Sequence, residues 1–212
     1  MTITFYDFPS APSPRRARII LREKGIEHET RIVDMMQGEQ MGEDFKAINP
    51  DCTVPALQLE DGAVLNDNWG IALWAETVAP EPALLGKTAS EKGQVGSWAA
   101  RIDFQATISF AEAFRNSHRN FKSRALPGPE NYDQIPELAE RGFAKLATFM
   151  AKLNDHLEGR NFIAIDVFSI ADIWALTTLD ACRWIKAGPT PENHPNIVRW
   201  HEMVSARKST HL

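Results

Sequence analysis

A Val-Pro step at the start of an apolar strand is the feature that most restricts how this chain folds. It lies in Thr53-Val54-Pro55-Ala56-Leu57, in the first third of the sequence. Proline lacks a backbone N–H, so it is tolerated at the first residue of a strand but not within a hydrogen-bonded ladder. We expect the Val54–Pro55 peptide bond to be cis, which turns the backbone N–H and C=O of Val54 outward. An extended peptide can then pair with Val54 as an added strand.

The segments around this step predict a mixed α/β domain. Residues 2–7 alternate and are rich in Thr, Ile, Phe and Tyr, which favours a strand. The next helix is expected over 14–24, with Ser13 as N-cap, Pro14 as its first residue and Gly25 as its stop. A strand is expected over 27–33 and a short helix over 43–48. A hairpin follows over 55–65, and a further helix begins at Asn66-Asp67-Asn68. This βαβ-α-ββα order is typical of a thioredoxin-like layout.

The second half of the chain predicts an all-helical domain beyond a proline-rich linker. The linker contains Val78-Ala79-Pro80-Glu81-Pro82, and Thr88 with Glu91 begins a long helix that we expect to reach Phe114. Further helices are expected over 137–157, 170–186 and 195–206. Ser169 and Asp172 have the spacing of a capping box, with Asp in place of the usual Glu. We therefore expect Asp172 to be buried and to accept backbone N–H groups near Ser169.

Composition excludes several classes of protein. A hydrophobic share of 43% with 24% charged residues describes an ordinary globular chain, and the net charge of −5 argues against nucleic acid as the main partner. No apolar run approaches the roughly 18 residues that span a bilayer, so no membrane partner is expected. Cys52 and Cys182 are the only cysteines and form no Cys-x-x-Cys motif. We expect neither a disulfide framework nor a metal cofactor, and a cytoplasmic location.

Taken together, these features resemble the cytosolic glutathione transferases. The Val54–Pro55 step, the element order and the Ser169–Asp172 cap carry the likeness, and Pro195–Trp200 resembles the last core helix of that family. The resemblance implies a thioredoxin-like glutathione-binding domain over 1–78, a linker over 79–87 and an all-helical domain over 88–212. It also implies glutathione as co-substrate, a homodimer and a role in detoxification.

The resemblance implies that a hydroxyl near the first helix lowers the pKa of the glutathione thiol. Aligning Arg16-Ala17-Arg18 with the family's Arg-Val-Arg puts Ala11 where serine-type classes carry their catalytic serine. Candidate hydroxyls are those of Ser13, Ser10 and Tyr6, the last resembling the first-strand tyrosine of tyrosine-type classes. Helix N-terminal N–H groups with an ordered water are the fourth possibility. We favour Ser13 with help from the helix terminus, although a plain N-cap role would use the same oxygen.

The resemblance also implies the binding residues, which are Gln40, Thr53, Val54, Asp67 and Asn68 for glutathione and Phe8, Phe110, Phe114 and His118 for the electrophile. Asp67-Asn68 replaces the family's Glu-Ser: Asp67 keeps an acceptor for an ammonium group, and Asn68 keeps a backbone N–H and adds an amide donor. Gln40 occupies the place of the residue that holds the glycyl carboxylate. Each assignment has a competing interpretation. Asp67 and Asn68 would only cap the helix, and Gln40 would be a surface glutamine without a role. Phe110 and Phe114 would pack in the core, and His118 would be a solvated loop histidine.

The leading hypothesis is a glutathione transferase that adds the thiolate of reduced glutathione to a small hydrophobic electrophile. One alternative is a glutathione-dependent thiol–disulfide oxidoreductase or reductive-cleavage enzyme on the same fold. The lack of a cysteine near residues 10–14 disfavours a glutaredoxin-like route. Another alternative is a non-catalytic binding protein, which Ala11 and the Asp67-Asn68 pair favour. The sequence does not identify the electrophile.

Overall fold

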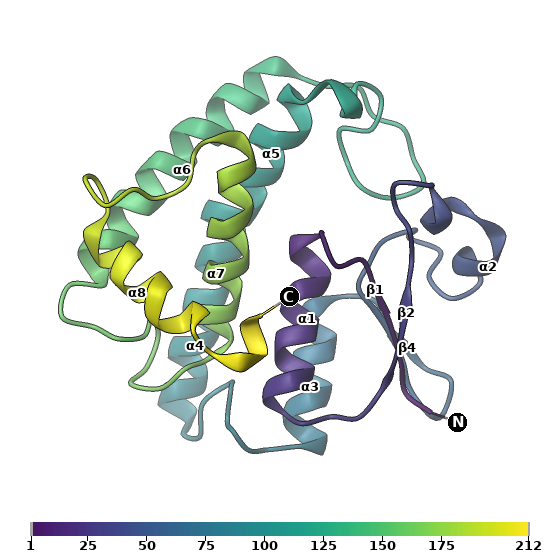
Figure 1. Ribbon diagram of the computed structural model, residues 1–212, viewed down its shortest axis with the longest axis horizontal. Helices are drawn as coiled ribbons and strands as arrows, with labels where there is room; N and C mark the ends of the chain where they lie inside the picture. The colour runs from purple at the N-terminus through teal and green to yellow at the C-terminus, as the bar shows by residue number, and fades with distance from the viewer. Residues whose placement is uncertain (1, 212) are drawn as a thin grey trace. The chain divides into compact units, whose positions relative to one another are not determined.

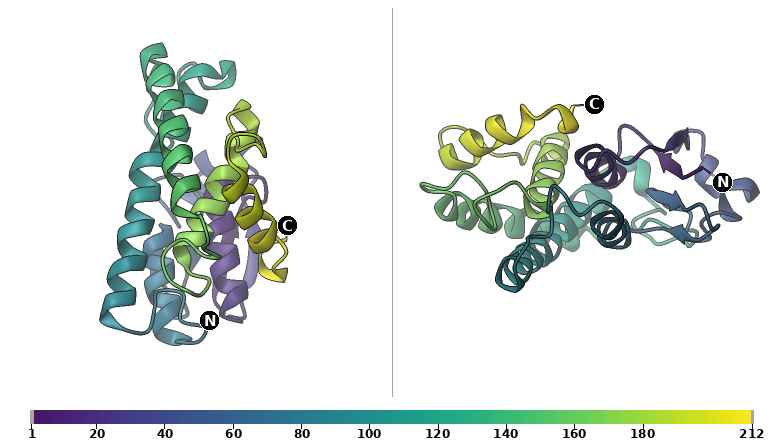
Figure 2. Two further views of the ribbon diagram at one scale, coloured as in Figure 1. Left: turned by 90° about the vertical axis from the view of Figure 1, so that its left-hand side faces the viewer. Right: turned by 90° about the horizontal axis from the view of Figure 1, so that it is seen from below.

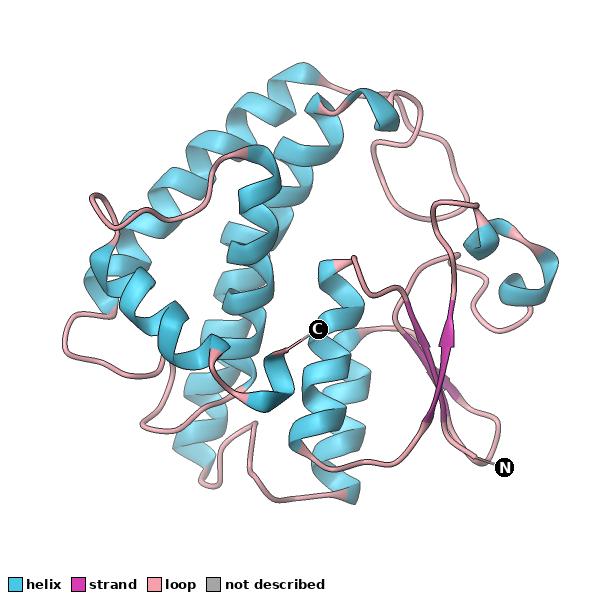
Figure 3. Ribbon diagram, viewed as in Figure 1, coloured by secondary structure: helices cyan, strands magenta, loops and turns pink. Residues whose placement is uncertain are grey.

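A computed structural model describes residues 2–211 and contains two compact units (Figures 1 and 3). The first unit runs to Pro82 and includes Leu126–Asn131, and the second comprises Ala83–Ala125 and Tyr132–His211. The first unit holds all the named strands and the second is helical, as the predicted fold class requires. Within the described residues, no helix combines the length and the apolar character that crossing a membrane needs.

The first unit is built on a four-stranded mixed sheet. Its strands are β1 (Thr4–Asp7), β2 (Glu29–Ile32), β3 (Ala56–Gln58) and β4 (Val64–Leu65), in the order β2-β1-β3-β4. β1 pairs with β2 in parallel, and β1–β3 and β3–β4 pair antiparallel. Each strand is shorter than the predicted segment, although backbone pairing continues just beyond the strand ends, where Val33 donates to the C=O of Asp7 at 2.8 Å and Leu59 to the C=O of Ala63 at 2.8 Å.

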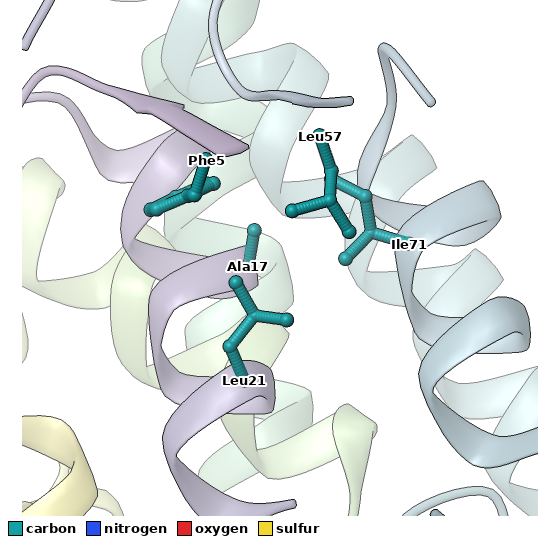
Figure 4. Packing of buried hydrophobic residues seen from close by; sticks show 5 residues of the cluster. All are labelled: Phe5, Ala17, Leu21, Leu57 and Ile71. Atoms are coloured by element: carbon teal, nitrogen blue, oxygen red, sulfur yellow. The ribbon is translucent and has the colours of Figure 1, made fainter. Parts of the chain in front are cut away.

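Two helices cover one face of this sheet and a short helix lies on the other. α1 (Pro12–Glu23) and α3 (Asn68–Val78) lie side by side in Figure 1. Their buried contact with the sheet is the cluster Phe5, Ala17, Leu21, Leu57 and Ile71 (Figure 4). α2 (Glu43–Lys46) belongs to a second cluster, composed of Tyr6, Val33, Phe45, Val54 and Ala56. Successive strand side chains point to opposite faces, so the neighbours Phe5 and Tyr6 belong to different clusters.

The first helix begins two residues earlier than the sequence predicts. Ala11 is its N-cap, with extended backbone angles, and Pro12 is its first residue. A turn fixes this start, because the N–H of Ala11 donates to the C=O of Phe8 at 2.9 Å. Ser13 is therefore the second helical residue, and the predictions of Ser13 as N-cap and Pro14 as first residue were wrong. Gly25, with φ of 61°, follows the helix as expected.

A buried lysine holds the segment that leaves the first unit. The Nζ of Lys24 lies 2.5 Å from a carboxylate oxygen of Glu76, and the side chain of this lysine is 0% exposed. The same ammonium donates to the C=O of Pro82 at 2.6 Å and to the C=O of Pro80 at 3.4 Å. α1, α3 and the proline-rich segment are thus joined at one charged group.

The second unit consists of helices around one buried helix (Figure 2). They are α4 (Ala89–Ile102), α5 (Ile108–Ser117), α6 (Pro136–His156), α7 (Ile170–Cys182) and α8 (Pro195–Ser205). A π-helical turn over Asp103–Thr107 separates α4 from α5, where the sequence predicted one continuous helix. Thr88 and Glu91 form the predicted capping box of α4. Every residue of α7 except Asp180 is buried, so this helix forms the core of the unit.

Asp172 is the polar centre of that core and has the predicted capping role. Its Oδ2 accepts the backbone N–H and the hydroxyl of Ser169 at 3.0 and 3.1 Å. Its Oδ1 accepts the N–H of Ile163 at 3.0 Å and the indole Nε1–H of Trp200 at 2.9 Å. Burial raises the pKa of Asp172 to about 6, although these four donors favour the charged form. Trp200 was not predicted to take part.

We expect Asp172→Ala to lower the free energy of unfolding by about 1–3 kcal/mol, because it leaves buried N–H donors without an acceptor. Thermal and urea unfolding of the variant and the wild type measure the change. Asp155→Ala on the exposed side of α6 is the matched control and should leave the midpoint close to that of the wild type. An unchanged midpoint in Asp172→Ala would contradict the role of this cap.

Candidate active site

The Val54–Pro55 peptide bond is cis, as predicted. Among residues 2–211, neither the backbone N–H nor the C=O of Val54 has a hydrogen-bond partner. β3 begins just beyond this step, at Ala56, so the unpaired backbone of Val54 directly precedes a paired strand. Such a stretch offers one donor and one acceptor to an extended peptide.

A buried asparagine that the sequence analysis did not select supports this stretch. Asn49 is 0% exposed, and its Nδ2 donates to the C=O of Thr53 at 2.8 Å and to its hydroxyl at 3.3 Å. Its Oδ1 accepts the N–H of Asp51 at 3.1 Å and the Nδ2 of Asn66 at 3.2 Å. Asn49 thereby fixes Thr53 and links the Val54 segment to the residues before α3. Its only sequence signal is the pair Asn49-Pro50, which directly follows the short helix predicted over 43–48.

Asp67 caps α3 with one of its two carboxylate oxygens. Its Oδ1 accepts the N–H groups of Trp69 and Gly70 at 2.8 and 2.9 Å. Within the described chain its Oδ2 has no hydrogen-bond partner, and neither does the backbone N–H of Asn68. Capping and ligand binding are therefore compatible at this residue, because each oxygen can serve a different partner.

The side chains of Ser13 and Asn68 meet at the N-terminal ends of α1 and α3. The Nδ2 of Asn68 donates to the Oγ of Ser13 at 3.0 Å. Ser13 is exposed, and its hydroxyl does not cap the helix, since Ala11 occupies the N-cap. The structure thus brings together two residues that the sequence analysis selected for different tasks.

The first turn of α1 carries a single unpaired backbone N–H. The first and third helical residues are Pro12 and Pro14, which have no N–H, so only Ser13 can donate in this turn. The positive end of the helix dipole and the one available N–H both belong to the residue that carries the hydroxyl. Side-chain and backbone stabilisation of an anion therefore converge on Ser13.

An ion pair holds the turn before this helix. Arg18 on α1 forms a bidentate contact with Asp7 at the end of β1, with both N···O distances 2.9 Å. The same guanidinium donates to the C=O of Pro9 at 3.4 Å. Both side chains are buried, so the pair fixes the path of the chain from β1 into α1.

The other candidates from the first unit lie away from this pair. Tyr6 is on the α2 face of the sheet, where its hydroxyl donates to Oε1 of Gln58 at 3.3 Å and its ring contacts Phe45. Phe8 packs against the same cluster. Ser10 is exposed in the turn before α1. Gln40 is half-buried in the turn Glu39–Met41, and its Oε1 is buried without a partner within residues 2–211.

The candidate electrophile residues of the second unit form one aromatic cluster. Phe110 and Phe114 stack with a ring-centroid separation of 5.5 Å, and His118 lies 5.5 Å from Phe114. Trp184 contacts both phenylalanines at 6.1 and 5.8 Å, and it is 52% exposed. Phe121 completes the cluster at 5.1 Å from Phe114. The sequence analysis missed Phe121, in the 3₁₀ turn Arg119–Phe121, and Trp184, in the 3₁₀ turn Arg183–Ile185 that follows α7 within the helix predicted over 170–186.

Residues 2–211 contain no group of three or more His, Cys, Asp or Glu side chains with the geometry of a metal site. The two cysteines, Cys52 and Cys182, are both free and buried. Burial raises the pKa of the Cys182 thiol to about 12, which makes it a poor nucleophile.

Two family models match this chain. The N-terminal domain of glutathione S-transferases matches residues 11–78, and the C-terminal domain of the same family matches residues 112–208. Glutathione S-transferase F9 of Arabidopsis thaliana is 31% identical over 205 residues, which cover 94% of this chain and 90% of that relative. The crystal structure of Gtt2 from Saccharomyces cerevisiae superimposes with a TM-score of 0.83 at 27% identity, covering 98% of each chain. LigF of a Sphingobium species is 25% identical over 234 residues, covering 98% of this chain and 91% of that protein.

Proposed function

Because this chain belongs to the cytosolic glutathione S-transferase family and is an enzyme of the glutathione transferase type, we propose that it conjugates reduced glutathione to small hydrophobic electrophiles. The observation that carries this proposal is the convergence of three features in the first unit. They are the unpaired backbone of Val54, the N-terminus of α3 and the hydroxyl of Ser13. Together they suit a short peptide with an anionic end and a thiol.

Glutathione has a polar partner in this unit for each of its parts. The cysteinyl backbone pairs with the N–H and C=O of Val54, as an added strand does. The γ-glutamyl carboxylate accepts the free N–H of Asn68 at the start of α3, where the helix dipole favours negative charge. The ammonium of the same residue contacts Oδ2 of Asp67. Gln40 donates its amide to the glycyl carboxylate, and Thr53 keeps the docking segment in place.

The chemical step depends on the thiolate form of glutathione, because the thiol itself is a weak nucleophile. A hydrogen bond from the hydroxyl of Ser13 to the sulfur favours the thiolate, and the N–H of Ser13 adds a second donor. The proton leaves to solvent, since Ser13 is exposed. The thiolate then forms the carbon–sulfur bond with the electrophilic carbon. In a substitution the bond from that carbon to the leaving group breaks and the leaving group departs with the electron pair, whereas in an addition the π electron pair moves to the neighbouring atom, which takes a proton from solvent.

We expect Ser13→Ala to raise the pKa of bound glutathione by about half a unit to one unit, which corresponds to the loss of one hydrogen bond. Turnover at neutral pH should fall while glutathione affinity stays nearly unchanged, because other residues hold the peptide. Thiolate absorbance titrated against pH measures the shift. Tyr6→Phe is the control, since Tyr6 is on the opposite face of the sheet, and it should leave the thiol pKa unchanged.

A loss of stability of about 1 kcal/mol in Ser13→Ala without a shift of the thiol pKa would assign Ser13 a structural role only, through its hydrogen bond with Asn68. If turnover survives both substitutions while the wild-type thiol pKa is lowered, the backbone N–H of Ser13 with an ordered water activates the thiol instead.

The aromatic cluster of Phe110, Phe114, His118, Phe121 and Trp184 supports a flat, apolar electrophile. Stacked and edge-on ring contacts of this kind stabilise an aromatic guest beyond simple burial. We expect Trp184→Ala to raise KM for an aromatic electrophile several-fold and to leave KM for glutathione unchanged. The control is Arg207→Ala, which removes an aromatic contact elsewhere in the second unit. Trp69→Ala is unsuitable as a control, because Trp69 lies beside the N-terminus of α3. Equal KM values for Trp184→Ala and the wild type would exclude this ring from the electrophile site.

Retention on immobilised glutathione, followed by a general thiol-conjugation assay, tests the proposed function. Retention with conjugation supports the transferase. Retention without conjugation favours a binding protein, and a wild-type thiol pKa equal to that of free glutathione would do the same. The similarity to LigF, a β-etherase, favours reductive ether cleavage by glutathione as a second candidate. An aryl ether in the substrate panel tests it: reductive cleavage releases the phenol and converts two molecules of glutathione to the disulfide, whereas conjugation leaves a glutathione thioether.

Three further properties belong to this proposal. The chain acts in detoxification, in the cytoplasm, and as a homodimer. Trp74 on α3 is partly buried and is a candidate for the dimer contact. Sedimentation at micromolar concentration tests the assembly, and a stable monomer would reject it.

A further inference from the structure

The contact between Ser13 and Asn68 is the only hydrogen bond of either side chain among residues 2–211. The Oδ1 of Asn68 is buried and has no donor there. Ser and Asn side chains near helix N-termini can bond to neighbouring backbone groups, and neither of these does. The two side chains are 55 residues apart in sequence, so the contact depends on how α1 and α3 pack.

Helical periodicity explains why the two residues meet. Ser13 precedes Ala17 and Leu21 at four-residue spacing, so it extends the stripe of α1 that packs on the sheet. Asn68 precedes Ile71 and Ala75 by three and seven residues, so it extends the buried stripe of α3. Each stripe thus ends in a polar side chain, and the two ends touch.

The direction of this hydrogen bond determines where the serine proton points. The amide donates and the Oγ of Ser13 accepts, so the hydroxyl proton is directed away from Asn68. Ser13 is the second residue of α1, and no carbonyl oxygen of the described chain accepts its proton. An oxygen that accepts one hydrogen bond also becomes a better donor in the next. The hydroxyl is therefore aimed and polarised before a ligand arrives.

We propose that Asn68 is a positioning residue for thiol activation: its side-chain amide fixes the hydroxyl of Ser13 so that the proton is presented to the glutathione sulfur. This inference rests on the proposed function and assigns the Asn68 side chain a task separate from the binding role of its backbone N–H. The backbone N–H holds the peptide, and the side chain acts on the sulfur through Ser13.

The test is a double-mutant cycle read out by the pKa of bound glutathione. Asn68→Ala should raise the thiol pKa by about half a unit to one unit, while the dissociation constant of glutathione changes by less than about threefold. In the Ser13→Ala background, Asn68→Ala should add no further shift, because the hydroxyl it orients is absent. Asn68→Ser gives a second variant, whose hydroxyl is too short to reach Oγ, and it should match Asn68→Ala. Asn193→Ala, an exposed asparagine of the second unit, is the matched control and should have the wild-type pKa.

Two outcomes would overturn the proposal while leaving the proposed function intact. One is weaker glutathione binding in Asn68→Ala with an unchanged thiol pKa, which would make Asn68 a binding residue only. The other is an equal shift with and without the Ser13 hydroxyl, which would show that Asn68 acts independently of it. A wild-type thiol pKa equal to that of free glutathione would instead reject the proposed function itself. Melting curves of all variants establish that each one is folded before the pKa is measured.

Discussion

The packing of α1 and α3 against one face of the sheet is the constraint on which the candidate site depends. Ala17 lies at the centre of this contact and is fully buried, and its small side chain lets α1 lie close to Phe5 and Leu57. Since both helices begin at the same end of the cluster, their polar first turns come together. Among residues 2–211, the side chains of Ser13 and Asn68 have no hydrogen-bond partner except each other, so their orientation depends on that packing.

The sequence predicted the fold class because its strongest signals are local. The proline at the start of β3 and the capping box at Ser169 and Asp172 each follow from a few adjacent residues, and both are present. The start of α1 was misplaced because Pro12 and Pro14 are both suited to a first helical position. The hydrogen bond from the N–H of Ala11 to the C=O of Phe8 makes Pro12 the first helical residue. The helix propensities of single residues do not describe such a turn.

The candidate site was harder to predict, because its contacts join distant segments. The sequence is equally consistent with a capping role and a binding role for Asn66, Asp67 and Asn68. The structure shows that Oδ1 of Asp67 caps α3 and that its Oδ2 has no hydrogen-bond partner among the described residues. Strand alternation from the buried Phe5 places Tyr6 on the opposite face of the sheet. Asn49 follows the short helix predicted over 43–48 and Trp184 lies near the end of the helix predicted over 170–186, and neither position by itself indicates a functional role.

The contact of Lys24 with the proline-rich segment has a consequence for sequence variation. The acceptors in that segment are backbone carbonyls of Pro80 and Pro82, which any residue type provides. The side chains that fix this connection are therefore those of Lys24 and Glu76, whereas the segment itself contributes backbone carbonyls. A substitution at Pro80 keeps the carbonyl that accepts from Lys24, whereas a substitution of Lys24 removes the donor itself. A chimera that carries a foreign helical domain is therefore best joined just after Pro82, where the first unit ends.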